Sequence, residues 1–160
     1  MLRRTIATVS VALATAFGLT VAADSAAAGT VTQTLRCLPG PSYRTVYVTV
    51  TAPDIVKKDV AAAVFVKMEH DEPWAGPGPG SPYTAGRLAL GGADSDTVTV
   101  SLSSPTVLEP GDPWILEGTV KVTFIRTGTG TLTFTGHGIP PWFNCGQADP
   151  PVAETVTVNP

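Results

Sequence analysis

The sequence contains two histidines, and neither stands in a pattern typical of catalysis. His137 lies between two glycines at the end of an apolar strand pattern, a setting that favours an exposed side chain over a general base. His70 is followed by Asp71 and Glu72, whose carboxylates could bind a metal with the imidazole or raise its pKa. Adjacent residues of an extended chain point to opposite faces, so these three side chains converge only at a turn. We therefore expect both histidines to be solvated, His70 at the charged start of a loop.

The other side chains suited to hydrolytic or metal chemistry are scattered. The sequence has no Gly-x-Ser-x-Gly motif of the kind that positions a nucleophilic serine. Asp94 and Asp96 could join a calcium site, but without further oxygen donors nearby they are more typical of a turn. Cys37 and Cys145 show none of the close spacings of zinc ligands, either with each other or with the histidines. Paired carboxylates of a glycosidase depend on separation in space, which the sequence does not give. We therefore predict no catalytic residue, no metal and no cofactor.

Residues 1–28 have the pattern of a secretory signal peptide. Two arginines near the start precede an apolar run over residues 6–23, and residues 26–28 are alanines of the kind that signal peptidase requires. We expect cleavage after Ala28, with cleavage after Ala23 as the alternative. The run is rich in Ala and Thr, which disfavours a membrane anchor, and the arginine pair leaves the general secretory and twin-arginine routes open.

The cysteine count agrees with export from the cell. Cys37 and Cys145 are the only two cysteines, and in an oxidising compartment an even number predicts a disulfide, here closing a loop of more than a hundred residues. No second apolar stretch follows the leader. The sequence thus predicts one domain over residues 29–160, located outside the cell or held at the cell envelope, without stable membrane insertion after cleavage.

Thr/Val-rich runs alternate with Gly/Pro-rich breaks along this domain, as in short antiparallel strands joined by turns. In residues 45–51 three valines fall on one face and polar or aromatic side chains on the other. Residues 118–124 and 131–135 flank a Thr-Gly-Thr-Gly segment and are expected to pair as a hairpin. The other candidate strands are residues 97–102 and, more weakly, residues 30–37, 87–90 and 152–158.

Residues 59–68 are apolar on both faces and fit either a central strand or a short helix, and their valines and phenylalanine favour the strand. Pro53 followed by Asp54 is typical of a helix start, which allows a single helical turn over residues 54–58. Seven or eight strands predict an all-β fold. We expect an antiparallel two-sheet sandwich, with a closed barrel as the alternative.

Several short motifs resemble small secreted immunoglobulin-like domains of unknown function from high-GC Gram-positive bacteria. The resemblance implies a β-sandwich with one disulfide and transfers no catalytic residue. The segment after the second cysteine departs from that pattern, because it contains a further candidate strand. The motifs that carry the resemblance are Leu-Arg-Cys-Leu-Pro at 35–39, Val-Thr-Ala-Pro at 50–53, Ser-Pro-Thr-Val at 104–107 with Pro-Gly at 110–111, and Gly-Thr-Leu-Thr-Phe at 130–134.

Aromatic side chains are the best candidates for contact with a ligand. Trp74 and Tyr83 frame a Pro/Gly-rich loop, and Trp142 lies in a second Pro-containing loop next to Cys145. An exposed indole or phenol can stack on a sugar or insert into a protein partner. The alternative for Trp74 and Trp142 is that each covers apolar surface. Trp114 is expected in the core.

The charge distribution excludes one class of partner. Ten basic and 13 acidic residues give a net charge of −3, and the basic residues are spread along the chain, so nucleic acid is not an expected partner. The sequence predicts a secreted, non-catalytic module that binds an extracellular protein or polysaccharide or has a structural role at the envelope. The alternatives are a carbohydrate-binding module that uses exposed aromatic residues and a small secreted hydrolase.

Overall fold

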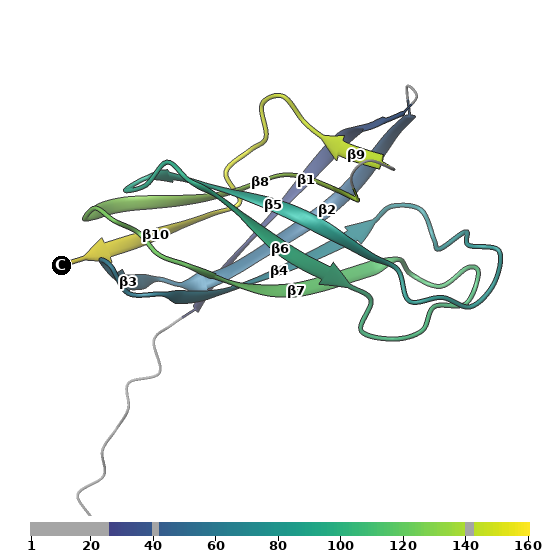
Figure 1. The fold of residues 1–160 in the computed structure, drawn as a ribbon, viewed down its shortest axis with the longest axis horizontal. Helices are drawn as coiled ribbons and strands as arrows, with labels where there is room; N and C mark the ends of the chain where they lie inside the picture. The colour runs from purple at the N-terminus through teal and green to yellow at the C-terminus, as the bar shows by residue number, and fades with distance from the viewer. Residues whose placement is uncertain (1–25, 40–41, 140–142) are drawn as a thin grey trace, which may run out of the picture.

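The computed structural model describes residues 26–39, 42–139 and 143–160, and these form ten β-strands without a helix (Figure 1). The strands are β1 (Ala26–Leu38), β2 (Ser42–Pro53), β3 (Ile55–Lys57), β4 (Ala62–His70), β5 (Tyr83–Gly92), β6 (Thr97–Ser103), β7 (Ile115–Val122), β8 (Gly128–Ile139), β9 (Phe143–Gly146) and β10 (Glu154–Asn159). The all-β prediction is confirmed. No helix long and apolar enough to cross a membrane occurs in the described ranges.

The strands close into a barrel, so the predicted two-sheet sandwich is wrong. Eight strands follow one another in the order β8-β5-β6-β7-β4-β2-β1-β9, and β9 also pairs with β8, which completes the ring. Because no free edge remains between two separate sheets, the closed barrel that was the alternative is the observed architecture. The immunoglobulin-like arrangement that the resemblance implied is wrong for the same reason.

The closing strand is short. β9 pairs with the end of β1 through the partners Arg36 with Gly146 and Cys37 with Cys145, and with the end of β8 through His137 with Cys145. The predicted Cys37–Cys145 disulfide is confirmed, and it links these directly opposed residues, whose Cα atoms are 4.0 Å apart. The bridge therefore lies where β9 joins β1 to β8 and closes the ring, a place called the seam below.

β8 pairs with β9 near its C-terminal end and with β10 near its N-terminal end, along the same edge. β10 pairs antiparallel with Gly128–Leu132, and β3 pairs parallel with β10, so that these two strands extend the sheet beside the ring. The helical turn considered for residues 54–58 is wrong, because three of those residues form β3. They extend to hydrogen-bond the final strand, as the bond from the Thr157 amide to the Asp54 carbonyl shows.

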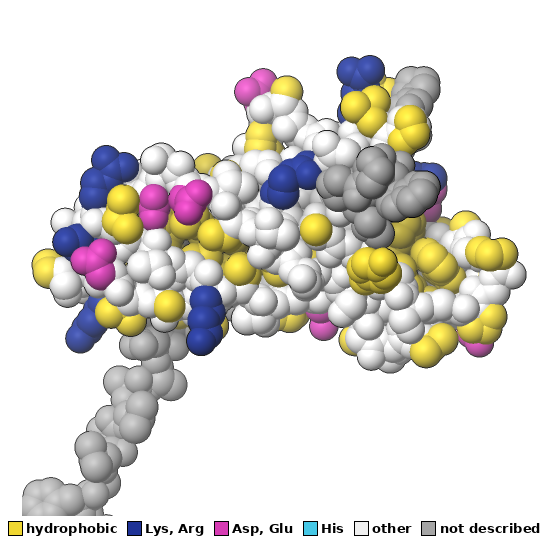
Figure 2. Space-filling view, in the orientation of Figure 1, with side chains coloured by type: hydrophobic (Ala, Val, Ile, Leu, Met, Phe, Trp, Pro, Cys, Tyr) yellow, Lys and Arg dark blue, Asp and Glu magenta, His cyan; other side chains and the backbone are white. Residues whose placement is uncertain are grey.

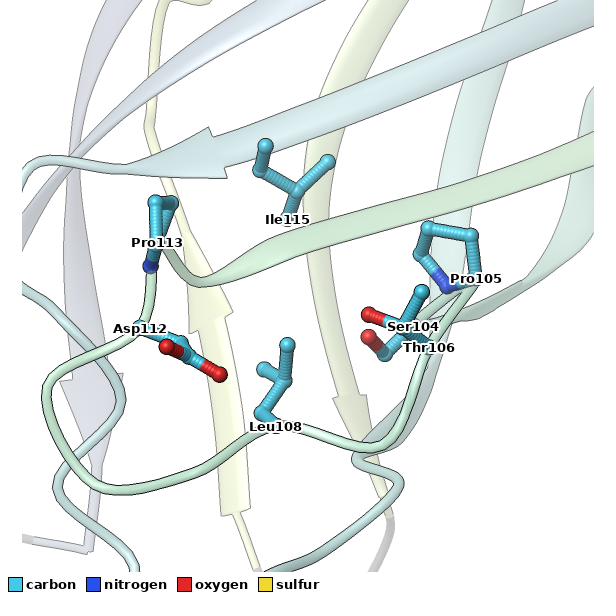
Figure 3. A pocket seen from close by; sticks show the side chains of 7 residues that line it. All are labelled: Ser104, Pro105, Thr106, Leu108, Asp112, Pro113 and Ile115. Atoms are coloured by element: carbon cyan, nitrogen blue, oxygen red, sulfur yellow. The ribbon is translucent and has the colours of Figure 1, made fainter.

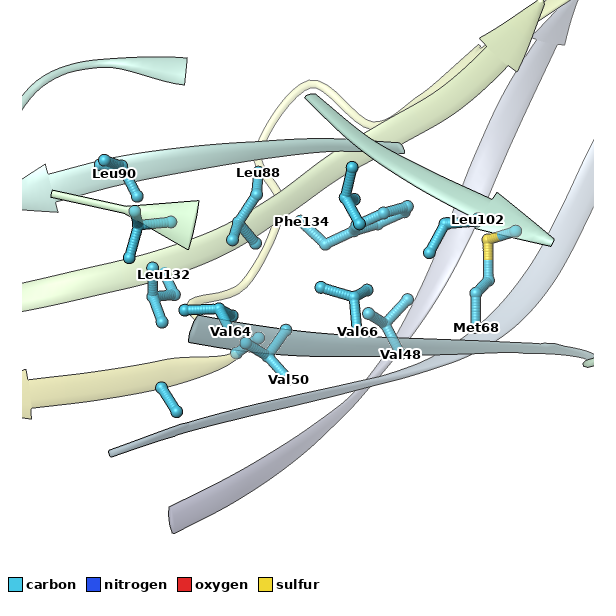
Figure 4. Close-up of a cluster of buried hydrophobic side chains, with 14 of the residues drawn as sticks. Val48, Val50, Val64, Val66, Met68, Leu88, Leu90, Leu102, Leu132 and Phe134 are labelled. Atoms are coloured by element: carbon cyan, nitrogen blue, oxygen red, sulfur yellow. The ribbon is translucent and has the colours of Figure 1, made fainter. Parts of the chain in front are cut away.

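Alternating apolar residues fill the barrel, as predicted. Val46, Val48 and Val50 are completely buried on β2, and residues 59–68 contribute to β4 rather than to a helix. Figure 4 shows the central cluster, in which Phe134 of β8 and Leu102 of β6 lie across from the valines of β2 and β4. This core occupies the middle of the barrel.

One predicted pairing is wrong. The segments at 118–124 and 131–135 lie in β7 and β8, which do not form a hairpin, because β4 and β6 occupy the two edges of β7 and β5 pairs with β8. The leader prediction falls mainly on residues outside the described ranges. Of residues 1–28, the structure describes Ala26–Ala28, which begin β1 opposite Thr51–Pro53.

Candidate functional site

A row of opposed residues crosses the seam at one end of the barrel. Cys37 of β1 lies opposite Cys145 of β9, which lies opposite His137 of β8, which lies opposite Gly86 of β5. Opposed residues in a sheet point to the same face. The cysteines, the histidine and the glycine therefore all face the barrel interior, and His137 is 2% exposed.

A β-bulge turns His137 inward. Leu132 and Phe134 face the core, so strict alternation would place residue 137 on the outer face. The pairing of β8 with β5 skips Thr135, since Leu88 pairs with Phe134 and Arg87 with Gly136. Gly136 has φ of +142°, a conformation that non-glycine residues rarely adopt, which allows this shift. The expectation of an exposed His137 is therefore wrong.

His70 reaches the same end of the barrel from β4. It continues the alternation of Val64, Val66 and Met68 on the inner face and is 6% exposed, so the expected solvated position is wrong. Its ring stacks on Trp114 with centroids 3.7 Å apart and planes at 9°, and it meets His137 edge to face at 5.6 Å. No histidine is visible on the face of the molecule shown in Figure 2.

These side chains line a pocket of about 210 Å³. Its walls come from five strands and from the segment before β7. The lining residues are Cys37, Arg44, His70, Trp114, His137 and Cys145. The pocket thus collects both histidines, both cysteines and the tryptophan predicted in the core, although their spacing in the sequence gave no indication of a site.

The end of the barrel that holds the pocket contains several buried polar side chains. Gln33 donates from Nε2 to the Phe134 carbonyl at 2.9 Å, and Thr84 Oγ1 lies 3.3 Å from His137 Nδ1. Both ring nitrogens of His70, the indole nitrogen of Trp114 and Oε1 of Gln33 are buried without a hydrogen-bond partner among the described residues. Buried polar groups are normally satisfied by protein, water or ligand. These four atoms have no such protein partner among the described residues.

Electrostatics keep the imidazoles neutral. Burial lowers the pKa of His70 to about 4, and the Arg44 guanidinium contributes to the shift. Burial, with smaller contributions from His70 and Arg87, lowers the pKa of His137 to about 3. Each histidine therefore offers one N–H donor and one acceptor nitrogen at neutral pH.

Two arginines flank the site. Arg44 forms an ion pair with Glu72, and Arg87 donates from Nη2 to the Cys145 carbonyl at 3.1 Å. Arg44 also lines the pocket, and it is the one lining residue with a permanent positive charge. One guanidinium has five N–H donors, so its pairing with a single carboxylate leaves donors for a second partner.

The pocket lining differs from a metal centre and from a catalytic triad in the side chains that it contains. The described residues include no group of three or more His, Cys, Asp or Glu side chains that could hold a metal ion. The two cysteines are joined in the disulfide, and the two arginines oppose a cation. No carboxylate in the pocket lining orients either imidazole as a general base. The pocket is lined by aromatic and imidazole rings, by the disulfide and by the Arg44 side chain.

The predicted contact residues lie apart from one another. Trp74 is half-buried. Its ring meets Trp114 edge to face at 5.4 Å, and Nε1 donates to the Gly78 carbonyl at 3.4 Å. Tyr83 is 68% exposed on β5, whereas Trp142 lies outside the described residues. The structure thus places Trp74 behind the site as support for Trp114 and leaves Tyr83 open to solvent.

A second hollow of about 220 Å³ lies between the loop after β6 and the start of β7 (Figure 3). Its acidic residue, Asp112, accepts a hydrogen bond at Oδ2 from the Glu109 amide at 2.8 Å and so holds the local turn. Apart from that carboxylate, apolar side chains and hydroxyls line the hollow. No histidine or cysteine is among the residues that line it.

No family model, curated protein or solved structure matches this chain. The resemblance to secreted immunoglobulin-like domains therefore rests on short motifs alone, and the fold that it implied is replaced by the barrel.

Proposed function

We propose that this protein is a secreted, non-catalytic β-barrel binding module, and that the pocket between His70, Trp114 and His137 holds a small molecule. The observation that carries the proposal is the pocket itself. The rings of His70 and Trp114 and the Cys37–Cys145 disulfide give it an apolar lining at one end of the barrel. A small molecule that fills this space would remove the apolar lining from water, which favours binding.

The pocket has the size and character of a small-ligand site. An apolar cavity of about 150 Å³ accommodates benzene, and this pocket is larger at about 210 Å³. Aromatic walls with a few placed polar groups are typical of such sites. The closed barrel supplies rigid strands on which the walls are held.

Secretion is supported by the leader pattern and by the disulfide. A bridge between Cys37 and Cys145 persists in oxidising compartments, which agrees with the signal peptide predicted at residues 1–28. Export followed by sequencing of the mature N-terminus tests this part and distinguishes cleavage after Ala28 from cleavage after Ala23. An uncleaved chain retained in the cytoplasm would contradict it.

The binding proposal is tested by NMR with ¹⁵N-labelled protein and a panel of small aromatic and aliphatic compounds. We expect at least one compound to shift the Trp114 indole and the amides of His70 and His137 in a saturable manner. The amides of Arg126 and Gly128 at the far end of the barrel should not move. If no compound moves the pocket resonances, the proposal fails.

Carbohydrate binding is a second candidate, favoured by Tyr83. This exposed phenol borders a groove of about 290 Å³ whose floor includes small residues, among them Ala85, Ser103 and Gly138. A phenol beside a shallow surface groove can stack on a sugar ring. Retention on insoluble polysaccharides should be lost in Tyr83→Ala and kept in Tyr43→Ala, which removes another tyrosine, one that is 64% exposed. Equal retention of both variants would remove this candidate.

A further inference from the structure

We propose that Cys37 is a site of covalent modification by small thiols, which reach its sulfur through the pocket and exchange with the Cys37–Cys145 disulfide. Both cysteines line the pocket, and the surface that its lining residues expose is apolar. Opposed residues of a sheet point to the same face, so both sulfur atoms lie on the inner side of the seam, toward this space. The inference goes beyond the proposed function, because it requires access to the pocket and not affinity for a ligand.

Access and geometry select Cys37 as the sulfur that is attacked. Cys37 is 8% exposed and Cys145 is 3% exposed, so Cys37 is the more accessible of the two. A thiolate attacks a disulfide sulfur from the side opposite the sulfur that leaves. β1 lies between β2 and β9 in the sheet, so the side of Cys37 away from Cys145 faces β2. Arg44 of β2 lines the same pocket, which places open space on that side.

Two arginines make the surroundings of the disulfide favourable to thiolates. Arg44 lines the pocket, and Arg87 donates to the Cys145 carbonyl at 3.1 Å. Their charges act in the interior, because each contributes to the lowered pKa of one of the two histidines. Glu72, which pairs with Arg44, opposes part of this effect. A nearby guanidinium stabilises a thiolate, so Cys145 next to Arg87 is suited to be the leaving group.

The exchange step balances with the small thiol as the only co-reactant. The incoming thiolate sulfur forms a bond to Cys37 Sγ, the Cys37–Cys145 bond breaks, and Cys145 Sγ leaves with the electron pair as a thiolate. The incoming sulfur is oxidised into a mixed disulfide, and Cys145 is reduced. A second small thiol can then attack the mixed disulfide, which releases Cys37 as a thiol and joins the two small thiols in a disulfide of their own.

Exchange removes the covalent link between β9 and β1. Three pairs of opposed residues then remain between the two strands, and β9 is four residues long. Backbone pairing alone holds so short a strand weakly, and weakly held elements open before the rest of a fold. The modified chain therefore opens first at the seam.

Reaction of the full, oxidised chain with 2-mercaptoethanol, quenched with acid at intervals and followed by mass spectrometry, tests the access route. We expect a rate proportional to the thiol concentration and a first adduct on Cys37. The dithiol of reduced thioredoxin is carried on a whole protein, which a pocket of about 210 Å³ does not admit. It should therefore react at least about tenfold more slowly per thiolate.

Three results would overturn the proposal. The first is a rate that levels off at the hydrogen-exchange rate of the Val48 amide in the buried core, because the thiol would then react only with the unfolded chain. The second is a first adduct on Cys145. The third is an equal rate per thiolate for 2-mercaptoethanol and thioredoxin.

Charge variants test the role of the arginines. Arg87→Gln should slow the reaction about threefold, because the Cys145 thiolate loses its neighbouring charge, and Arg87→Lys should restore most of the rate. A merely structural role would have the opposite sign, since loss of the hydrogen bond to Cys145 would loosen β9 and speed the reaction. Arg126→Gln removes the same charge from an exposed position at the other end of the barrel and should react like the parent protein.

An unchanged or faster reaction in Arg87→Gln, or equal slowing in Arg126→Gln, would overturn the assignment of Cys145 as the leaving thiolate. If Arg87→Gln does not fold, Arg44→Gln removes the charge that lines the pocket and should slow the reaction by about the same factor. An unchanged rate in Arg44→Gln would then have the same meaning.

Discussion

The imidazoles of His70 and His137 meet edge to face inside the barrel, with centroids 5.6 Å apart and planes at 87°. They come from β4 and β8, which are not neighbours in the sheet, so the contact crosses the barrel interior. Two neutral imidazoles can occupy such a position, whereas two imidazolium ions would repel each other in a poorly solvated space. This contact makes one end of the barrel sensitive to acid.

The first prediction concerns acid. The pKa values of His70 and His137 fall from 6.5 to about 4 and about 3 in the folded protein, so below pH 6.5 the unfolded chain binds more protons than the folded one. The stability from the neutral histidines is therefore fully present above pH 6.5 and is lost as the pH falls through the folded values. His70 alone should account for roughly 3 kcal/mol of that loss. Urea unfolding at a series of pH values measures it.

A single variant separates this effect from the titration of carboxylates. His70→Phe keeps a ring against Trp114 and removes two buried polar atoms, so we expect it to raise the free energy of unfolding at neutral pH by about 1 kcal/mol. Its stability should fall less steeply than that of the parent protein between pH 6.5 and about 4. Parallel curves for the two proteins would show that His70 does not carry the acid sensitivity.

The second prediction concerns the disulfide. The bridge joins residues 108 positions apart, and its removal in Cys37→Ser with Cys145→Ser should lower the free energy of unfolding by about 4 to 5 kcal/mol. Hydrogen exchange should accelerate first in β9 and in the β8 residues that pair with it, because these close the seam. Unchanged exchange there, with a stability loss spread over all strands, would contradict the seam argument.

The third prediction concerns a glycine inside the barrel. A Cβ on Gly86 would lie 2.9 Å from each of Leu102, Phe134 and Val100, so Gly86→Ala should cost about 1 to 3 kcal/mol through overpacking. Gly78 has no atom within 4 Å of the corresponding position, and Gly78→Ala should be neutral or slightly stabilising. Thermal unfolding compares the two, and equal midpoints would refute the packing argument.

The fourth prediction concerns the loop around Trp74. The indole lies against Trp114, and a Cβ on Gly76 would meet its ring at 2.3 Å, so the loop is folded around this side chain. Trp74→Ala should cost about 2 kcal/mol and expose the loop to protease between residues 76 and 80. Limited proteolysis followed by mass measurement locates the cut. Equal cleavage rates in parent and variant would mean that the tryptophan does not hold the loop.

Local alternation predicted most strands but not how they close. The buried valines of β2 and β4 follow directly from a period of two, since each strand has one face in the core. Closure depends on β9, which has four residues after a Pro-Pro pair and carries no such pattern. A sandwich and a barrel share the same alternation, so the difference rests on pairings between distant strands that local sequence does not encode.

The two halves of the site differ in the same way. His70 could have been found by extending the alternation of Val64, Val66 and Met68 by one step. His137 could not, because the bulge at Thr135 reverses the faces of β8, and a glycine at position 136 is only a weak sign of a bulge. The aromatic contact between Trp114 and His70 needs β4 and β7 in register, because Trp114 directly precedes β7, and it is a property of the assembled barrel.

The position of the disulfide on the seam also determines how the protein would transmit a mechanical load. If the chain were stretched between its ends, tension would strip β10 from β8 and then reach Cys145. There it would pass through the sulfur atoms to Cys37 and leave along β1, bypassing the 108-residue interval between the cysteines. His70, Trp114 and His137 all lie within the bypassed interval, so the load would reach the pocket through its two cysteines and would not pass along the backbone that carries its aromatic walls.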